Sequence, residues 1–399
     1  MKLLMRIKRT VHFKLPFFYY FLVNLISIFL AAIKYKVFFL NGKKAHWYLQ
    51  TRKGEDYLQN KWKSVYSISD PLILPLEKVN EINFPNWQSL NIDDIHQFNP
   101  SIVFVKNAIR IAWRISNVSF NPATFPNGDP KQANANGDFN AIGIGEISSY
   151  EMDFNQKISN FRILLDPRNC ESQTKYQDEY GRNRDFEDPR FLPDLPNLML
   201  LHTRYTGMIK QKNLPNYDVA LYDLDSENIT ILKLVSGMRS EKNWVPIGFD
   251  DQKYRFLRST KPFSIITFDF DKKTISEISN SEEEFGDEHN GSNFLLIDKK
   301  FYLRVIRKSI SIQGLRDVRI NTFTLHDLDL NEIDRTLPFI FKDFGFEICN
   351  SIAEHSNKIY FAWGMDDTSG FLGCIGKSEL VKWIRKNLIS EVMHEPDFF

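Results

Sequence analysis

Residues 184–190, which read Arg-Asp-Phe-Glu-Asp-Pro-Arg, and residues 241–246, which read Glu-Lys-Asn-Trp-Val-Pro, are two similar polar stretches in the middle of the chain. Each combines charges of both signs with an aromatic residue and a proline. Burying such a cluster costs free energy unless every charge has a partner. Pro189 fixes its own φ, removes a backbone donor and pushes Asp188 toward an extended conformation. The first stretch is therefore predicted to be a stiff turn that presents its charges at a site, with a solvated surface turn as the alternative.

The chain around these stretches, from Phe98 onward, consists of short apolar runs separated by polar turn residues. Many runs alternate between apolar and polar residues, and their spacing of roughly 8–12 residues leaves no helical patterns between them. The 34 Phe and 15 Tyr residues also favour a β-rich interior. The predicted strands lie within residues 101–116, 139–147, 159–165, 198–205, 217–224, 229–234, 244–249, 254–259, 264–270, 294–297, 301–306, 319–325, 348–353, 358–363 and 372–375.

These strands group into about five units of roughly 40–60 residues, which predicts an all-β fold, a five-bladed β-propeller. A sandwich or a barrel is the alternative. Residues 121–138 and 169–184 are rich in Asn, Asp, Gly and Pro, and they are predicted to be long loops over a site. Residues 378–388 are predicted to form a short amphipathic C-terminal helix that is capped by Ser378.

The N-terminal region contains an apolar segment, residues 15–33, which carries no charged residue and has basic residues on both sides. At a helical rise of about 1.5 Å per residue, this segment nearly spans the roughly 30 Å hydrocarbon core of a bilayer. It predicts an N-terminal apolar helix that anchors the protein in a membrane. A helix lying on the membrane or on the domain, or a signal peptide, is the alternative. We expect a membrane-associated protein, with a cytoplasmic location as the alternative.

The predicted organisation has three parts: a basic N-terminus with the anchor or membrane-lying helix (1–40), a lead-in segment (41–97) and the propeller domain (98–390). The 51 Lys and Arg residues balance the 50 Asp and Glu residues, so no general basic field attracts nucleic acid. The three cysteines show no metal-binding spacing and are too few for a disulfide scaffold. No phosphate-binding Gly-rich loop, catalytic triad order or metal-ligand cluster stands out, so we expect no cofactor and no metal.

In a propeller, the first strand of each blade lines the central channel, so polar residues at blade starts converge on one pocket. Five polar signatures occupy such starts. They are Asn99-Pro100-Ser101, Glu187-Asp188-Pro189-Arg190, Glu241-Lys242-Asn243-Trp244, His289-Asn290-Gly291-Ser292 and Phe344-Gly345-Phe346-Glu347.

The order and spacing of these signatures over residues 98–377 resemble glycoside hydrolase family 130, the inverting β-mannoside phosphorylases, and the related β-mannosyltransferases of the same five-bladed fold. The resemblance implies that Asp188 is the general acid, which delivers its proton through a sugar hydroxyl. It also implies that Arg190 and Lys242 bind phosphate or the adjoining sugar. The family's phosphate clamp uses further Arg and His residues, for which the candidates are Arg204, Arg258, His289 and Arg304. Other predicted substrate-binding residues at or near the blade starts are Asn99, Arg114, Glu187, Asn243, Glu347 and Asp366.

The residue types fit this chemistry. Glycosyl transfer passes through an oxocarbenium-like state and needs a carboxyl group that manages the proton on the departing or arriving oxygen. Guanidinium groups stabilise a phosphate by bidentate contacts. Each residue also has a simpler interpretation, because Asp188 and Arg190 would also serve as a structural ion pair and Lys242 as a solvated surface lysine. The tryptophans Trp113, Trp244 and Trp363 offer faces to sugar rings, although a place in the propeller core is the favoured interpretation.

We therefore predict a glycosyltransferase that forms a β-glycosidic linkage, with mannosyl as the favoured sugar, in surface polysaccharide or glycolipid assembly. The partners would be a sugar donor (a sugar phosphate or a nucleotide sugar), a glycan acceptor and a membrane bound through residues 15–33. An inverting glycoside phosphorylase that acts on β-mannosides is the first alternative. A glycan-binding propeller without catalysis is the second.

Overall fold

The computed structural model describes residues 72–87, 95–106, 108–117, 139–148, 157–169, 186–195, 198–209, 214–232, 243–250, 252–260, 263–279, 288–312, 315–342 and 346–390. The apolar segment 15–33, Lys242 and the predicted loops, apart from residue 169, lie outside these ranges, and the predictions made for them remain predictions. Within the described ranges, no helix is both long enough and apolar enough to cross a membrane.

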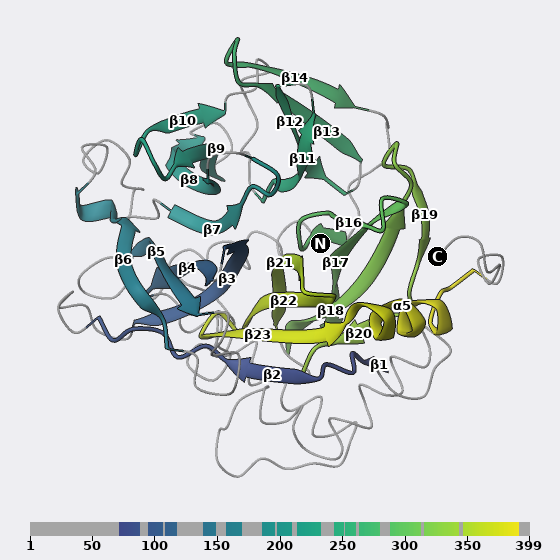
Figure 1. Cartoon of the computed structure of the whole chain (residues 1–399). Helices are drawn as coiled ribbons and strands as arrows, with labels where there is room; N and C mark the ends of the chain where they lie inside the picture. The colour runs from purple at the N-terminus through teal and green to yellow at the C-terminus, as the bar shows by residue number, and fades with distance from the viewer. Residues whose placement is uncertain are drawn as a thin grey trace, which may run out of the picture.

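The described strands form five sheets arranged around a common centre, as in a propeller (Figure 1). The first sheet contains β3 (His96–Val105), β4 (Ala108–Ser116), β5 (Asn140–Ser148) and β6 (Ser159–Leu165) in that order. The second contains β7 (Phe186–Phe191), β8 (Met199–Ile209), β9 (Leu214–Asp223) and β10 (Ile229–Leu232). The third contains β11 (Val245–Asp250), β12 (Lys253–Ser259), β13 (Ser264–Asp269) and β14 (Thr274–Ser279).

The fourth sheet is larger. Its main path contains β15 (Glu288–Asn290), β17 (Phe301–Ile312), β18 (Leu315–His326), β20 (Phe339–Ile340) and β1 (Leu72–Ile73) in that order. Two further strands extend it: β16 (Leu295–Ile297) pairs with β17, and β19 (Glu332–Arg335) pairs with β18. The fifth sheet contains β21 (Glu347–His355), β22 (Lys358–Met365), β23 (Ser369–Gly376) and β2 (Lys78–Glu81). The predicted all-β, propeller-like fold is confirmed.

The burial of each strand follows its place in the sheet. The middle strands β5 and β22 are buried over six consecutive residues, because both of their faces pack against neighbouring sheets. The outer strand β6 begins with four exposed residues. Trp113, Trp244 and Trp363 are each at most 1% exposed and lie in three separate hydrophobic clusters. They are therefore core residues, which leaves no face for a sugar ring.

A strand near the start of the described chain pairs with the last strand, β23, in the fifth sheet. Strand β2 pairs antiparallel with β23, with Lys78 opposite Cys374 and Glu81 opposite Phe371. Strand β1 pairs in parallel with β20 and so joins the fourth sheet. The lead-in thus supplies an edge strand to two sheets (Figure 1).

The predicted C-terminal helix is confirmed as α5 (Lys377–Lys386), with Leu380 and Ile384 buried. The predicted cap is wrong: Gly376 occupies the N-cap position, and no side-chain capping bond is formed. The backbone amide of Gly376 instead donates to Glu77 Oε1, and the amide of Lys377 donates to the Asn357 carbonyl. The helix therefore begins at the end of β23, where these two hydrogen bonds already hold the backbone to Glu77, which precedes β2, and to Asn357, in the turn before β22.

Two buried histidines predict an acid-sensitive fold. Burial lowers the pKa of His202 to about 4 and the pKa of His326 to about 3, with Arg204 and Arg304, respectively, adding to the shift. Because an unfolded histidine has a pKa near 6.5, stability is unaffected above that pH and falls as the pH drops toward these values. At pH 5 each histidine is expected to cost on the order of 2 kcal/mol. Chemical denaturation at pH 7 and pH 5 measures this loss. His202→Gln should lessen it, and an unchanged pH dependence would contradict the assignment.

Candidate active site

The first strands of the first two sheets carry matching irregularities. Strand β3 shifts register between Phe98 and Ser101, and β7 shifts between Glu187 and Arg190. Asn99 has φ 51° and Asp188 has φ 47°, and a proline follows each of them. A proline donates no ladder hydrogen bond, and Asn and Asp tolerate positive φ better than most residues. The predicted stiff turn is therefore a bulge inside a buried strand, and the predicted extended conformation of Asp188 is wrong.

The other three sheets also bring an asparagine to their inner edge. Asn243, with φ 61°, lies two residues before β11, Asn290 ends β15, and Asn350 lies at a register shift in β21. The Nδ2 of Asn290 donates to the Asn243 carbonyl (3.0 Å), and the Nδ2 of Asn350 donates to the Asn99 carbonyl (2.9 Å). These side chains tie neighbouring sheets together at the centre.

Asp188 lies in this centre and is 8% exposed. The Nδ2 of Asn99 donates to Asp188 Oδ1 at 2.9 Å, and Arg114 Nη1 lies 3.7 Å from the same oxygen. A Cβ on Gly364 would lie 2.2 Å from Asn99 Oδ1, so only glycine lets β22 approach this closely. Packing from the fifth sheet therefore holds Asn99 against Asp188.

Arg114 connects the acidic groups of the site. Its Nη2 lies 3.4 Å from Glu187 Oε1 and donates to Asn140 Oδ1 at 2.7 Å. Burial lowers the pKa of Arg114, but Glu187, Asp188 and Asp367 outweigh it and raise the pKa above the ordinary value. Arg114 is therefore a fixed cation beside Asp188.

A second cation at the site, Arg307 on β17, was absent from the sequence predictions. It is 8% exposed, and its Nε and Nη1 atoms have no hydrogen-bond partner among the described residues. Burial lowers its pKa, whereas the charges of Asp188 and Asp367 oppose that shift. A buried guanidinium with unused donors beside a carboxyl group fits an anionic group of a ligand.

The predicted Asp366 and its neighbour Asp367 have different surroundings. Asp366 Oδ1 accepts a hydrogen bond from the Phe346 amide at 3.0 Å, as expected for a turn residue. Asp367 is 5% exposed and interacts electrostatically with Arg114 and Arg307. Of the two adjacent aspartates, Asp367 is therefore the one whose charge acts on the cations of the site.

Arg190 has a bridging position. Its Nη1 donates to the carbonyls of Gly291 and Asn350, and its Nη2 donates to Asn350 Oδ1 at 3.1 Å. Burial lowers the pKa of Arg190 to about 10, with Asp188 opposing the shift. These three hydrogen bonds join the second sheet to the fourth and fifth sheets, so Arg190 holds the centre together.

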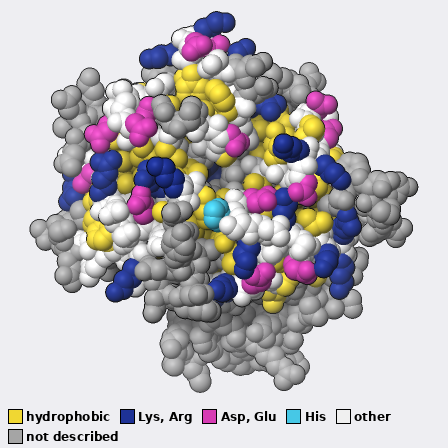
Figure 2. Space-filling model, in the orientation of Figure 1, with side chains coloured by type: hydrophobic (Ala, Val, Ile, Leu, Met, Phe, Trp, Pro, Cys, Tyr) yellow, Lys and Arg dark blue, Asp and Glu magenta, His cyan; other side chains and the backbone are white. Residues whose placement is uncertain are grey.

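Glu347, Arg258 and His289 were also predicted to bind substrate, and each has different surroundings. Both oxygens of Glu347 accept backbone N–H bonds, from Phe341 and Lys342, so this carboxylate stabilises a turn. Arg258 pairs with Glu277 at 2.6 Å. His289 is exposed and lies opposite Arg307 in the pairing of β15 with β17. Figure 2 shows charged side chains of both signs, with histidine among them, around the middle of the visible face.

Arg304 occupies a separate buried cluster. Its guanidinium stacks over Phe294 at 5.0 Å and its Nε donates to His326 Nε2 at 3.3 Å. Arg304 and Arg307 are three residues apart on one strand, so their side chains point to opposite faces. The structure thus brings Asn99, Arg114, Glu187 and Asp188 together with Arg307 and Asp367, and it places Arg304 elsewhere.

Solved structures of other proteins have a fold similar to that of this chain. No protein-family model and no curated protein sequence matches the chain. One similar solved structure comes from the GH130 family of mannoside phosphorylases, which contains glycoside hydrolases that target β-1,2 mannosidic linkages in Candida mannan. Its TM-score to this chain is 0.52 and its identity is 13%, and the match covers 77% of this chain and 97% of that chain. This chain has the fold of a mannoside phosphorylase.

A second solved structure supports the same conclusion. The β-1,2-mannobiose phosphorylase from Listeria innocua, in complex with β-1,2-mannobiose, is similar with a TM-score of 0.50 and 13% identity, again covering 77% of this chain and 97% of that one. The resemblance carried by the polar signatures is therefore confirmed as a similarity of fold. At 13% identity, the similarity shows that this chain and the two proteins share a fold.

Proposed function

We propose that the chain is a five-bladed propeller enzyme that transfers a glycosyl unit, with mannosyl favoured, from a phosphate-bearing donor to a glycan acceptor. The five described sheets would be the five blades. The observation that carries the proposal is buried Arg307, which has two unused donors and whose charge interacts with that of Asp188. A carboxyl group next to an anion-binding cation is what transfer from a sugar phosphate requires.

In this proposal Asp188 manages the proton on the glycosidic oxygen, and Asn99 and Arg114 orient its carboxyl group. Arg307 binds the phosphate group and stabilises its charge as the bond to the sugar breaks or forms. Glu187 and Asp367 offset the positive charge of Arg114 and Arg307. Lys242, in the chain segment just before Asn243, would add a further cation.

The runner-up is an inverting phosphorylase that converts a β-mannoside and inorganic phosphate into a sugar 1-phosphate. The fold similarity to solved mannoside phosphorylases favours it. The same residues would then act on free phosphate. The apolar segment 15–33 favours the biosynthetic reaction, because a membrane-anchored enzyme suits the assembly of surface glycans.

A donor screen tests both reactions. The protein is incubated with nucleotide sugars or sugar 1-phosphates and a panel of acceptors, while nucleotide and phosphate release are followed. Nucleotide release supports a nucleotide-sugar transferase, and phosphate release from mannose 1-phosphate supports the phosphorylase. Release of neither, with glycans still raising the melting temperature, would contradict both and leave a glycan-binding propeller.

Arg307→Met tests the anion site. We expect it to raise KM for the phosphate-bearing substrate about 10–100-fold, since a hydrogen bond to a charged group contributes about 1.5–3 kcal/mol. Arg335→Met is the matched control, because Arg335 pairs with Glu288 and Glu332 within the fourth sheet. An unchanged KM in Arg307→Met, at normal stability, would remove Arg307 from the site.

A further inference from the structure

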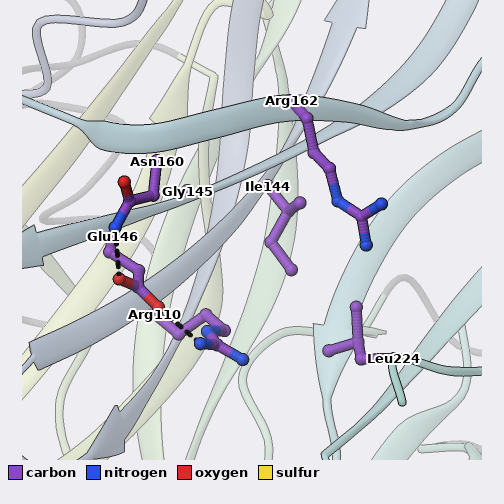
Figure 3. Close-up of a pocket in the computed structure, with 7 residues that line it drawn as sticks. All are labelled: Arg110, Ile144, Gly145, Glu146, Asn160, Arg162 and Leu224. Carbon is purple, nitrogen blue, oxygen red and sulfur yellow. Dashed lines mark hydrogen bonds and ion pairs between the residues drawn. The ribbon is translucent and has the colours of Figure 1, made fainter.

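A pocket separate from the candidate active site lies between the first and second sheets. We call it the seam pocket, and it has a volume of about 240 Å³. Its lining side chains come from β4, β5, β6 and the turn after β9 (Figure 3): Arg110, Ile144, Glu146, Asn160, Arg162 and Leu224.

The seam pocket is distinct from the site around Asp188. Arg110 and Arg114 lie four residues apart on β4, so their side chains share one face of the sheet at a spacing of about 13 Å. Ala112 lies between them on that face and belongs to a buried cluster with Ile142 and Leu200. Packed apolar side chains therefore separate the two sites.

The walls of the seam pocket are polar and ordered by hydrogen bonds. Arg110 forms an ion pair with Glu146, and Asn160 Nδ2 donates to Glu146 Oε2 at 3.1 Å. Arg162 pairs across the seam with Glu227 at 3.1 Å. A guanidinium group has five N–H donors, so these pairs leave donors for a ligand.

The floor of the pocket is apolar. Figure 3 shows the guanidinium groups of Arg110 and Arg162 on two sides of an open space, with Ile144 and Leu224 beside it. A ligand that fits must offer several hydrogen-bonding groups at its edge and an apolar patch on its face. The ring of a sugar residue has this pattern, because its hydroxyls surround a face of C–H groups.

Charge and size restrict the ligand further. The two arginines are balanced by Glu146 and Glu227, so the pocket has no surplus charge that favours an anion. The volume of about 240 Å³ lies below the roughly 300–1,000 Å³ of pockets for drug-sized ligands. A ligand group of about one ring is therefore the best match.

We propose that the seam pocket is a second carbohydrate-binding site, which holds one sugar residue of a neutral glycan away from the active site. The choice of a glycan rests partly on the proposed function. Such a site keeps a polymeric acceptor on the enzyme between reactions, since two linked contacts raise the effective concentration of the second.

Affinity electrophoresis in native gels that contain β-mannan, yeast mannan or dextran tests the proposal with the full chain. Wild type is expected to be retarded in at least one of these gels. Arg162→Ala and Leu224→Trp are expected to lose that retardation and to keep the wild-type melting temperature. Arg162 is 54% exposed, and an exposed ion pair contributes at most about 1 kcal/mol.

Lys382→Ala is the matched control, because it removes an exposed ion pair with Glu379 on α5. Equal retardation of wild type and both seam variants would overturn the proposal. So would the absence of retardation in all three gels.

The donor screen distinguishes failure of this inference from failure of the proposed function. If the protein turns over its donor but the seam variants are retarded as much as wild type, the second binding site is rejected and the proposed function stands. Retardation that Arg162→Ala abolishes, in a protein without turnover, supports the seam pocket and rejects the enzyme.

Discussion

Asp188→Asn is expected to lower kcat about 10²–10⁴-fold, the usual contribution of a general acid or base. Asparagine has the same shape and keeps an oxygen that can accept the hydrogen bond from Asn99 Nδ2. It cannot take the proton that the acceptor hydroxyl loses as the glycosidic bond forms, nor supply the proton that the glycosidic oxygen needs when the bond is cleaved. The substrate KM should change little, because the binding groups remain. Steady-state kinetics with the donor found in the screen measures both constants.

Asp269→Asn is the matched control for this substitution. Asp269 is similarly buried, at 9% exposure, but its Oδ1 accepts backbone N–H bonds from Asp271 and Lys272 in the turn after β13. We expect wild-type kcat from this variant. A normal kcat in Asp188→Asn would rule out Asp188 as the general acid, and glycan binding that survives the loss of turnover would separate catalysis from recognition.

Arg190→Ala is expected to destabilise the fold by about 3 kcal/mol or more. It removes the donor of the hydrogen bonds to the carbonyls of Gly291 and Asn350 and to the Oδ1 of Asn350 in a buried centre. Each buried acceptor that loses its partner costs about 1–3 kcal/mol. The cavity left by the long side chain adds to this cost. Urea denaturation measures the change in the free energy of unfolding.

Arg190→Lys and Arg162→Ala are the comparison variants for Arg190. Lysine retains the charge but not the forked geometry that reaches both sheets, so a partial loss is expected. Arg162→Ala removes an exposed arginine and should leave stability within about 1 kcal/mol of wild type. If Arg190→Ala folds with normal stability and instead raises KM for phosphate, Arg190 binds substrate as the family resemblance implies.

Much of the architecture was predictable from the sequence. Apolar runs with short polar turns marked most strands, and Trp113, Trp244 and Trp363 marked three cores. Strands β1 and β2 were not predicted, because their partners lie about 270 to 300 residues later in the chain, as the pairs Leu72–Phe339 and Lys78–Cys374 show. A local pattern contains no information about such distant pairing.

The site was predictable where a motif marked it. The bulges at Asn99 and Asp188 each carry a proline, and that signal is visible in the sequence. Arg307 carries no such mark, because it lies in the middle of β17, directly opposite His289 of the blade-start motif. Reading that register would have found Arg307. Asp366 was predicted as a site residue in place of its neighbour Asp367. The sequence pattern of two adjacent turn residues does not show which side chain faces the site.

The pairing of β2 with β23 also determines when the molecule can be completed during synthesis. Residues 78–81 leave the ribosome early, yet their hydrogen-bonding partners, residues 371–374, emerge almost 300 residues later. At roughly 5–20 residues per second, β2 therefore waits on the order of 15–60 s as an unpaired strand. Throughout that interval β2 is open to pairing with other chains. The nascent protein is thus expected to depend on chaperones until its last sheet is translated.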